Sequence, residues 1–282
     1  MNNAAVLFIS GQSNAHAHDQ KMEEKDWITT PLKNVFALDR KENQSFDITD
    51  VTWSGYTSTG KNLGETQDNT YCFAYYMAKM WQRAIDAGKE LPDLYIVQIS
   101  IGAQGIINGM WNRDKEKILK PGVLGTVDIA LFPLALHIYH LAIQNLKNSG
   151  KNPQVIGWHW IGSEQEIWYE AYKKDDFSER YDYFFDAMLD AIGMECPLYL
   201  YKIYPELNCK RYGLPVEAAS YINKELQRQC SKKQNATMVK AEKSPYWNLN
   251  EEKWGIFSDY CHYIPKVQQW FAEQFFTKVV KE

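Results

Sequence analysis

A short polar loop after the first apolar run carries a candidate nucleophile. Residues 11–14 read Gly-Gln-Ser-Asn and directly follow the run Ala5–Ser10. A serine hydroxyl becomes a nucleophile when a neighbouring base takes its proton. If Ser13 opens a helical turn, its own N–H points to the carbonyl oxygen of the group under attack. The tetrapeptide fits a helix cap equally well, with Ser13 as N-cap and Asn14 as a turn residue.

A candidate base and its partner lie near the other end of the chain. The loop before the last helical segment contains Asp259 and His262. The Asp-x-x-His spacing lets the carboxylate reach the imidazole Nδ1 across one turn, which leaves Nε2 free to take a serine proton. The two loops can meet if both leave the same edge of a parallel sheet.

The other histidines favour less direct roles. His137 and His140 lie in an apolar helical segment, as core or surface residues. His159 lies within a buried strand, where a histidine satisfied by its neighbours is more common than a catalytic one. His16 and His18 follow the candidate nucleophile, and either can line a cleft.

Short apolar runs alternate with longer segments of helical spacing along the whole chain. The short runs are continuous, which is typical of strands covered on both faces. We expect strands at Ala5–Ser10, Leu94–Ile101, Gln154–Ile161, Leu198–Tyr204 and Ala236–Lys240. We expect helices at Tyr71–Ala87, Ile129–Lys147, Glu179–Ile192, Pro215–Gln229 and Tyr263–Val280.

This alternation predicts an α/β fold. We expect a single doubly wound, flavodoxin-like domain over residues 1–282, with about five parallel strands and helices on both faces. Functional residues of such folds lie at the carboxyl ends of the strands. The segments after Ser10, Ile101 and Ile161 and the loop before the last helix are therefore expected to form the site.

The composition excludes several classes of protein. Hydrophobic residues make up 45% of the 282 residues, so the chain is not largely disordered. The net charge of −4 disfavours a non-specific nucleic-acid binder, which needs a basic face. No run of ~18 apolar residues predicts a membrane span. The chain has no phosphate-binding glycine motif and no metal-ligand spacing, so we expect neither a cofactor nor a metal.

The compartment stays open at this point. Five irregularly spaced cysteines without a CxxC motif argue against a zinc knuckle or a dense disulfide framework, although a single bridge is compatible with them. The first ten residues lack a basic region and a cleavage site, so they predict a strand and not a secretory leader. We expect a cytoplasmic protein on this basis, or a periplasmic or secreted one if a leader was removed.

These motifs together resemble the SGNH hydrolase superfamily. The resemblance is to the branch of sialate O-acetylesterases and carbohydrate (acetylxylan) acetylesterases. The Gly-Gln-Ser-Asn of residues 11–14 is similar to the nucleophile block of that branch, and Asp259 with His262 is similar to its final Asp-x-x-His. These two motifs are specific in combination.

Weaker matches extend the resemblance over nearly the whole chain, in order. Residues 34–38 resemble the second strand of the branch, and Phe73 with Ala74 resembles the dipeptide after its Gly-Pro loop. The segment Ile101–Gly105, with Trp111 beyond it, is similar to the block that usually carries Gly-Gly-Thr.

The third block departs from the pattern Trp-x-Gln-Gly-Glu-Ser-Asp of the branch. Trp160 and Glu164 are kept, whereas Gly162 and Ser163 replace Gln-Gly and Glu166 replaces the final Asp. In the branch that Gln donates to the oxyanion, and loss of one such donor costs ~10²–10³ in turnover. The resemblance therefore leaves the strength of the activity open.

The resemblance implies a serine esterase that removes small acyl groups, acetyl above all, from carbohydrate esters through an acyl-enzyme. Ser13 would attack the carbonyl, His262 would move the proton, and Asp259 would hold the imidazole. The backbone N–H groups of Ser13 and of Gly102 or Gly105 would bind the oxyanion.

Further side chains are expected at the same site. Gln12 and Asn14 flank the nucleophile, and Gln104 or Gln165 is expected to point to the acyl oxygen. We interpret Glu164 as an orienting carboxylate. Paired glycosidase carboxylates face each other ~5–9 Å apart across a sugar, which neighbours on one strand end rarely do.

The expected partner is an acetylated carbohydrate, with no nucleic acid and no membrane. Aromatic residues make up 14% of the chain, and aromatic rings can stack on sugars. The candidates are Trp53, Trp111, Trp160 and Trp168, with Trp160 favoured as a core residue. Two alternatives stay open: a carbohydrate-binding relative with little or no activity, and a lipase or thioesterase of the same fold. The sugar, the acetyl position and the oligomeric state are not determined.

Ester hydrolysis should depend on pH if His262 is the base. A protonated imidazole cannot accept the serine proton, and a histidine ordinarily titrates at ~6.5. We therefore expect turnover of a short acyl ester to fall below about pH 6. The measurement is the initial rate between pH 5 and pH 8, and an unchanged rate would contradict His262 as base.

Overall fold

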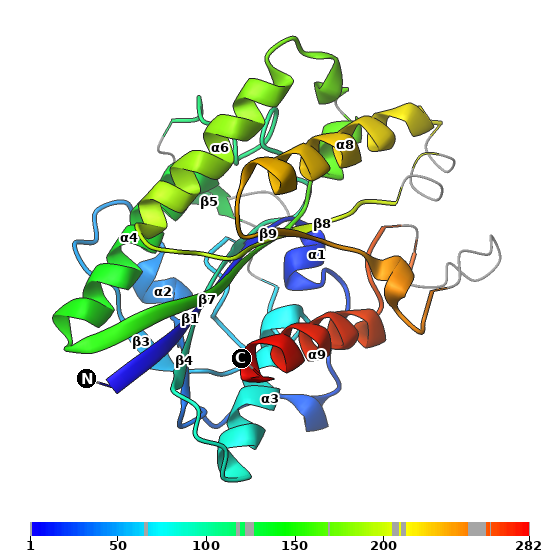
Figure 1. The fold of residues 1–282 in the computed structure, drawn as a ribbon. Helices are drawn as coiled ribbons and strands as arrows, with labels where there is room; N and C mark the ends of the chain where they lie inside the picture. Colours follow the sequence, from blue (N-terminus) through cyan, green and yellow to red (C-terminus); the bar gives the residue numbers. More distant parts are fainter. Residues whose placement is uncertain are drawn as a thin grey trace.

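A twisted seven-stranded sheet forms the centre of the molecule (Figure 1). The computed structural model describes residues 2–64, 67–116, 119–121, 127–168, 170–204, 209, 213–247, 258–259 and 261–281. In spatial order the strands are β3 (Trp53–Gly55), β2 (Val35–Leu38), β4 (Asp93–Ser100), β1 (Asn2–Gly11), β7 (Lys151–Ile161), β8 (Leu198–Tyr201) and β9 (Ala236–Val239). Neighbouring strands are parallel except for β2 and β3.

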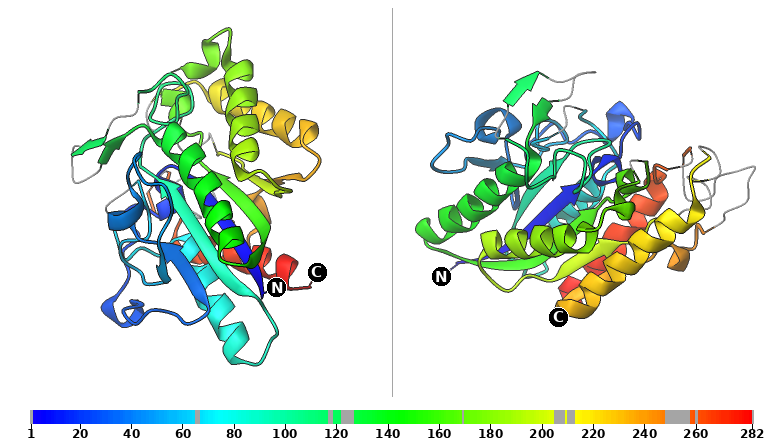
Figure 2. Two further views of the ribbon diagram at one scale, coloured as in Figure 1. Left: turned by 90° about the vertical axis from the view of Figure 1, so that its left-hand side faces the viewer. Right: turned by 90° about the horizontal axis from the view of Figure 1, so that it is seen from above.

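All five predicted strands are present, and their order, β4-β1-β7-β8-β9, is that of a flavodoxin-like sheet. The expected count of about five was too low, because β2 and the antiparallel β3 extend the sheet beyond β4. β3 has only three residues, so no long apolar run marks it. Strands β5 (Leu119–Pro121) and β6 (Val127–Ile129) form a separate antiparallel pair that stands apart from the main sheet (Figure 2).

Five long helices cover the two faces of the sheet, each at a predicted helical segment. They are α3 (Phe73–Asp86), α4 (Leu131–Asn148), α6 (Phe177–Ile192), α8 (Val216–Lys232) and α9 (Pro265–Lys281). Helices α3 and α9 lie on one side of the sheet and α4, α6 and α8 on the other (Figure 1). The short helices are α1 (Ser13–His16), η1 (Glu24–Asp26), α2 (Arg40–Asn43), α5 (Gln165–Trp168), η3 (Ala171–Lys173) and η4 (Ala241–Lys243). Among the described residues, no helix is both long and apolar enough to cross a membrane.

The central strand β1 explains why the strand sequences are continuously apolar. Its side chains alternate between the two faces of the sheet. Val6 and Phe8 belong to the core that includes α4, α6 and α8, whereas Leu7 and Ile9 belong to the core that includes α3 and α9. Because both faces are covered, every residue from Ala4 to Ile9 is at most 1% exposed.

The three central strands end level with one another. Gly11, the last residue of β1, is in register with Ser100 of β4 and with Ile161 of β7. The loops after these strands therefore leave the carboxyl edge of the sheet side by side. The approach of β1 to β7 is close, because a Cβ on Gly11 would lie 2.0 Å from the carbonyl oxygen of Ile161.

We expect Gly11→Ala to lower the free energy of unfolding by about 3 kcal/mol, because the new methyl group collides with backbone. Gly11 also has a φ of +143°, which an L-residue rarely adopts. Chemical denaturation measures the loss. The matched control is Gly150→Ala, since Gly150 also has a positive φ of +74° but has open space around it; it should lose only about 1 kcal/mol. Equal losses would show that the close approach is unimportant.

Candidate active site

Ser13 lies where the chain leaves the sheet. It is the first residue of α1, directly after β1, and it is half-buried. The helix ends after one turn because Ala17 adopts a left-handed conformation with a φ of 54°. Gly102, in the loop after β4, lies beside Ser13: a Cβ on Gly102 would lie 3.9 Å from the Ser13 Cβ. The loops after β1 and β4 thus meet at Ser13.

Asp259 and His262 form the hydrogen bond that their spacing predicts. The His262 Nδ1 lies 2.8 Å from the Asp259 Oδ2. The other oxygen, Oδ1, accepts the backbone N–H groups of Cys261 at 2.7 Å and His262 at 2.8 Å. Burial alone would raise the pKa of Asp259, but these hydrogen bonds outweigh it and hold that pKa well below its usual range. The carboxylate is therefore ionised at neutral pH and fixes the imidazole through Nδ1.

Asn14 joins the loop of Ser13 to the loop of His262. Its Oδ1 accepts the backbone N–H of Tyr263 at 2.9 Å, and its Nδ2 donates to the carbonyl oxygen of Cys261 at 2.9 Å. Cys261 and Tyr263 are the two neighbours of His262 in the chain. Because Asn14 follows Ser13, these bonds hold the loop of the candidate base against the loop of the candidate nucleophile.

The third block of the sequence also reaches Asn14. Glu164, after β7, accepts a hydrogen bond from the Asn14 Nδ2 through Oε1 at 3.0 Å. Burial raises the pKa of Glu164, while the bond from Asn14 and the nearby His262 lower it. The expectation that Glu164 orients a residue near Ser13 therefore agrees with its hydrogen bond to Asn14.

Two further histidines lie beside His262. The ring of His18 is 5.3 Å from that of His262 and 5.9 Å from that of His16, measured between centroids. His16 is buried and its Nδ1 lies 3.2 Å from the Ser100 Oγ. Burial, with smaller effects of His18 and His262, lowers the pKa of His16 to about 3. His16 is therefore neutral at working pH, whereas His18 is partly exposed beside the candidate base.

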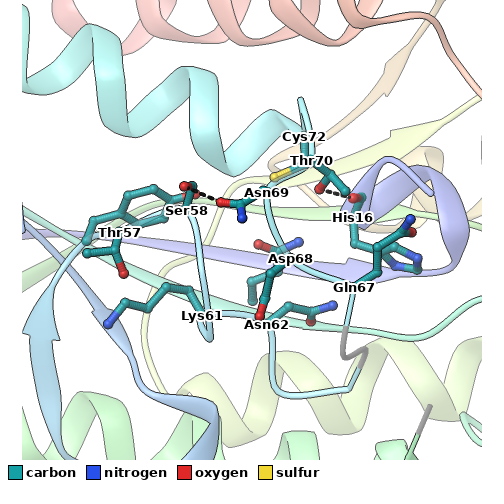
Figure 3. Close-up of a pocket in the computed structure, with 12 residues that line it drawn as sticks. His16, Thr57, Ser58, Lys61, Asn62, Gln67, Asp68, Asn69, Thr70 and Cys72 are labelled. Carbon is teal, nitrogen blue, oxygen red and sulfur yellow. Dashed lines mark hydrogen bonds between the residues drawn. The ribbon is translucent and has the colours of Figure 1, made fainter. Parts of the chain in front are cut away.

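A small polar pocket behind α1 is too small for a sugar (Figure 3). It holds about 20 Å³, roughly the space of one water molecule. The Thr70 hydroxyl donates to the His16 carbonyl oxygen, and the Ser58 hydroxyl donates to Asn69. The first of these bonds holds Thr70 against α1 and the second joins Ser58 to Asn69, so the lining of the pocket supports the loop of Ser13.

The altered third block is accommodated by Gln12. A Cβ on Gly162 would lie 3.2 Å from the Gln12 Cγ, so the Gln12 side chain occupies the space beside residue 162. The Gln12 Nε2 donates to the carbonyl oxygen of Gln104 at 2.6 Å. Ser163, with a φ of +98°, is wholly buried and accepts a hydrogen bond from the Trp160 indole at 3.0 Å. A larger residue at 162 would displace Gln12.

The other residues expected to donate to the oxyanion, Gln104, Gln165 and Gly105, lie in different surroundings. The Gln104 Oε1 accepts the backbone N–H of Met110 at 3.0 Å, which turns its amide group towards its own loop. Gln165 is half-buried in α5. Gly105 packs against Glu166, because a Cβ on Gly105 would lie 2.5 Å from the Glu166 Oε1. Of these two glycines, Gly102 is the one that lies beside Ser13.

Most of the tryptophans expected to stack on a sugar are buried in the core or lie at the far edge of the sheet. Trp111 and Trp160 are 0% exposed, so the expectation for Trp111 was wrong and the core role of Trp160 is confirmed. The Trp53 indole donates to Asn145 at 2.9 Å, at the far edge of the sheet. Trp168, which follows the third block, is 37% exposed and stays a candidate.

Two histidines outside the site, His159 and His137, have structural partners. His159 is 1% exposed, stacks on Tyr199 and lies 3.0 Å from the Tyr201 hydroxyl through Nδ1. The His137 Nε2 lies 2.8 Å from the carbonyl oxygen of Ile48. Within the described ranges, no three His, Cys, Asp or Glu side chains are grouped to hold a metal ion.

Solved structures share this fold over the full length of the chain. No protein-family model matches the chain, and no curated protein matches it by sequence. NanS is 12% identical with a TM-score of 0.67, covering 99% of this chain and 97% of that one. The Arabidopsis thaliana protein AT4G34215 is 12% identical with a TM-score of 0.58, covering 100% and 99%. XAC1771, a carbohydrate acetylesterase from Xanthomonas citri, is 13% identical with a TM-score of 0.49, covering 96% of this chain and 54% of that one. The chain therefore has the α/β fold of NanS and the Arabidopsis protein.

We expect Asn14→Ala to lower the free energy of unfolding by about 3 kcal/mol. The change leaves the Tyr263 N–H and the Cys261 carbonyl without their buried partner, and each such loss costs ~1–3 kcal/mol. Chemical denaturation is the measurement, with Asn152→Ala as control because Asn152 is an exposed asparagine with one side-chain hydrogen bond. A loss no larger than that of the control would mean that Asn14 does not hold the two loops together.

Proposed function

We propose that this chain is a serine esterase of the SGNH hydrolase type that removes small acyl groups, acetyl above all, from carbohydrate esters. The observation that carries the proposal is the Asp259–His262 hydrogen bond, held against the loop of Ser13 by Asn14. The order of the sequence motifs and the fold shared with NanS are consistent with it.

The proposed reaction has two steps that use the same three residues. The Ser13 Oγ attacks the ester carbonyl while the His262 Nε2 takes its proton. The tetrahedral intermediate then expels the sugar alcohol, which receives that proton, and leaves an acyl-serine. A water molecule, deprotonated by His262, attacks the acyl-serine, releases the carboxylic acid and restores Ser13. Asp259 offsets the charge of the imidazolium through Nδ1.

The proposed oxyanion site combines donors from two loops. The N–H of Ser13 lies at the start of α1, and the N–H of Gly102, a residue that lies beside Ser13, is proposed as the second donor. Such donors stabilise the charge that develops on the carbonyl oxygen. Gln165 is proposed as a third donor, in place of the Gln that Gly162 replaces, because the Gln104 amide is turned towards its own loop. Trp168 is the proposed stacking surface for the sugar.

We expect Ser13→Ala to lower the turnover of p-nitrophenyl acetate by at least about 10³-fold, because no other group takes over the covalent step. The release of p-nitrophenol measures the rate. Ser231→Ala, which removes an exposed hydroxyl on α8, is the control and should match the wild type. Full activity of the Ser13 variant would exclude the proposed mechanism.

The same assay separates the alternatives. A preference for acetyl over octanoyl esters supports an acetylesterase, whereas the reverse preference indicates a lipase or thioesterase. Binding of an acetylated sugar without any turnover by the wild type would indicate a carbohydrate-binding protein on the same fold.

A further inference from the structure

A wholly buried carboxyl group holds the loop that follows β4. Glu166, on the short helix α5, is 0% exposed. Its Oε1 accepts the backbone N–H groups of Ile106 and of Ile107, the latter at 3.2 Å. The Glu166 side chain therefore spans from the end of β7 to the loop that starts beside Ser13.

The loop is shaped to receive this carboxyl group. A Cβ on Gly105 would lie 2.5 Å from the Glu166 Oε1, so only a glycine leaves room for it. A Cβ on Gly109 would lie 2.1 Å from the Gly105 nitrogen, and the Gly109 N–H donates to the Gly105 carbonyl at 3.1 Å. Both glycines permit a turn that presents the N–H groups of residues 106 and 107 to one acceptor.

The second oxygen of Glu166 is enclosed. Its Oε2 is buried and has no hydrogen-bond partner in the described structure. Burial raises the pKa of Glu166 to about 7, although the two backbone donors and the more distant Lys174 lower it. Tyr181 of α6, whose hydroxyl is also buried, interacts electrostatically with Glu166, Glu164 and Glu225, and Glu225 of α8 pairs with Arg228. A carboxyl group is thus kept here without a counter-ion in hydrogen-bond contact, which favours its uncharged form.

The position of this loop determines what lies next to Ser13. Gly102 lies beside Ser13, and the backbone carbonyl oxygen of Gln104 accepts a hydrogen bond from the Gln12 side chain. Glu166 holds the residues that follow immediately. We propose that Glu166 is a positioning residue for the esterase reaction, which sets the Gly102 N–H at the acyl oxygen by holding Ile106 and Ile107. This inference rests on the proposed esterase function.

The kinetic test compares two variants of Glu166. Glu166→Met keeps the length of the side chain but cannot accept a hydrogen bond, and we expect its kcat for p-nitrophenyl acetate to fall tenfold or more with KM within twofold. This pattern marks a contact that acts in the transition state. Glu166→Gln keeps the acceptor oxygen and an uncharged group, so its kcat should stay within threefold of the wild type.

The matched control is Gln82→Met. The buried Gln82 Oε1 also accepts two backbone N–H groups, those of Lys33 and Asn34, far from Ser13. This variant should lose stability as Glu166→Met does but keep the kcat of the wild type. If Glu166→Met also keeps that kcat while Ser13→Ala abolishes it, the positioning role is wrong and the esterase function stands. If the wild type hydrolyses no ester, the function fails and the positioning role fails with it.

A second measurement does not need activity or a stable Met variant. In the wild type, the amide resonances of Ile106 and Ile107 should shift with pH around a midpoint near 7, as the carboxyl group that they contact ionises. In Glu166→Gln this titration should be absent. Resonances that titrate equally in the Gln variant, or that are the same in the wild type and the Gln variant at every pH, would overturn the proposed contact.

Discussion

One buried amide side chain connects the two ends of this chain. Asn14 is 1% exposed and bonds to Cys261 and Tyr263, which lie 247 and 249 residues away. The backbone carbonyl oxygen of Asn14 also accepts a hydrogen bond from the Gln268 side chain of α9. A buried amide that makes all its hydrogen bonds adds to the stability of the fold, whereas each buried donor or acceptor left without its partner lowers that stability by ~1–3 kcal/mol. Asn14 therefore joins the loop of the candidate nucleophile to the loop of the candidate base.

The sheet supplies the second constraint. β1 lies between β4 and β7, and all three end in register, which brings the segments after Gly11, Ser100 and Ile161 together. The close approach of β1 and β7 is possible only because residue 11 has no side chain. The loops of Ser13, Gly102 and Glu164 therefore share one edge, and only the segment of Asp259 and His262 has to be brought there by hydrogen bonds.

Three carboxyl groups around the site differ because their surroundings differ. Asp259 accepts one ring and two backbone hydrogen bonds, and these outweigh its partial burial and lower its pKa. Glu164 and Glu166 are enclosed with one oxygen each unpartnered, so burial dominates and raises both pKa values. The balance of donors against burial thus gives one fixed anion beside the imidazole and two carboxyls suited to holding loops.

The pattern of the sequence determined five of the seven strands of the main sheet and the five long helices, because continuous apolar runs and helical spacing reflect burial that is local to each element. It also predicted the Asp259–His262 hydrogen bond, since three residues span one turn. The strand count missed the edge strand β3, which has three half-buried residues, and left out β2, although residues 34–38 resemble the second strand of the branch. Tertiary structure alone decided that Trp111 is covered, that Gln12 lies beside Gly162, and that Glu166 reaches Ile106 and Ile107. These contacts depend on which distant segments of the chain pack against each side chain, and local patterns in the sequence carry no information about that.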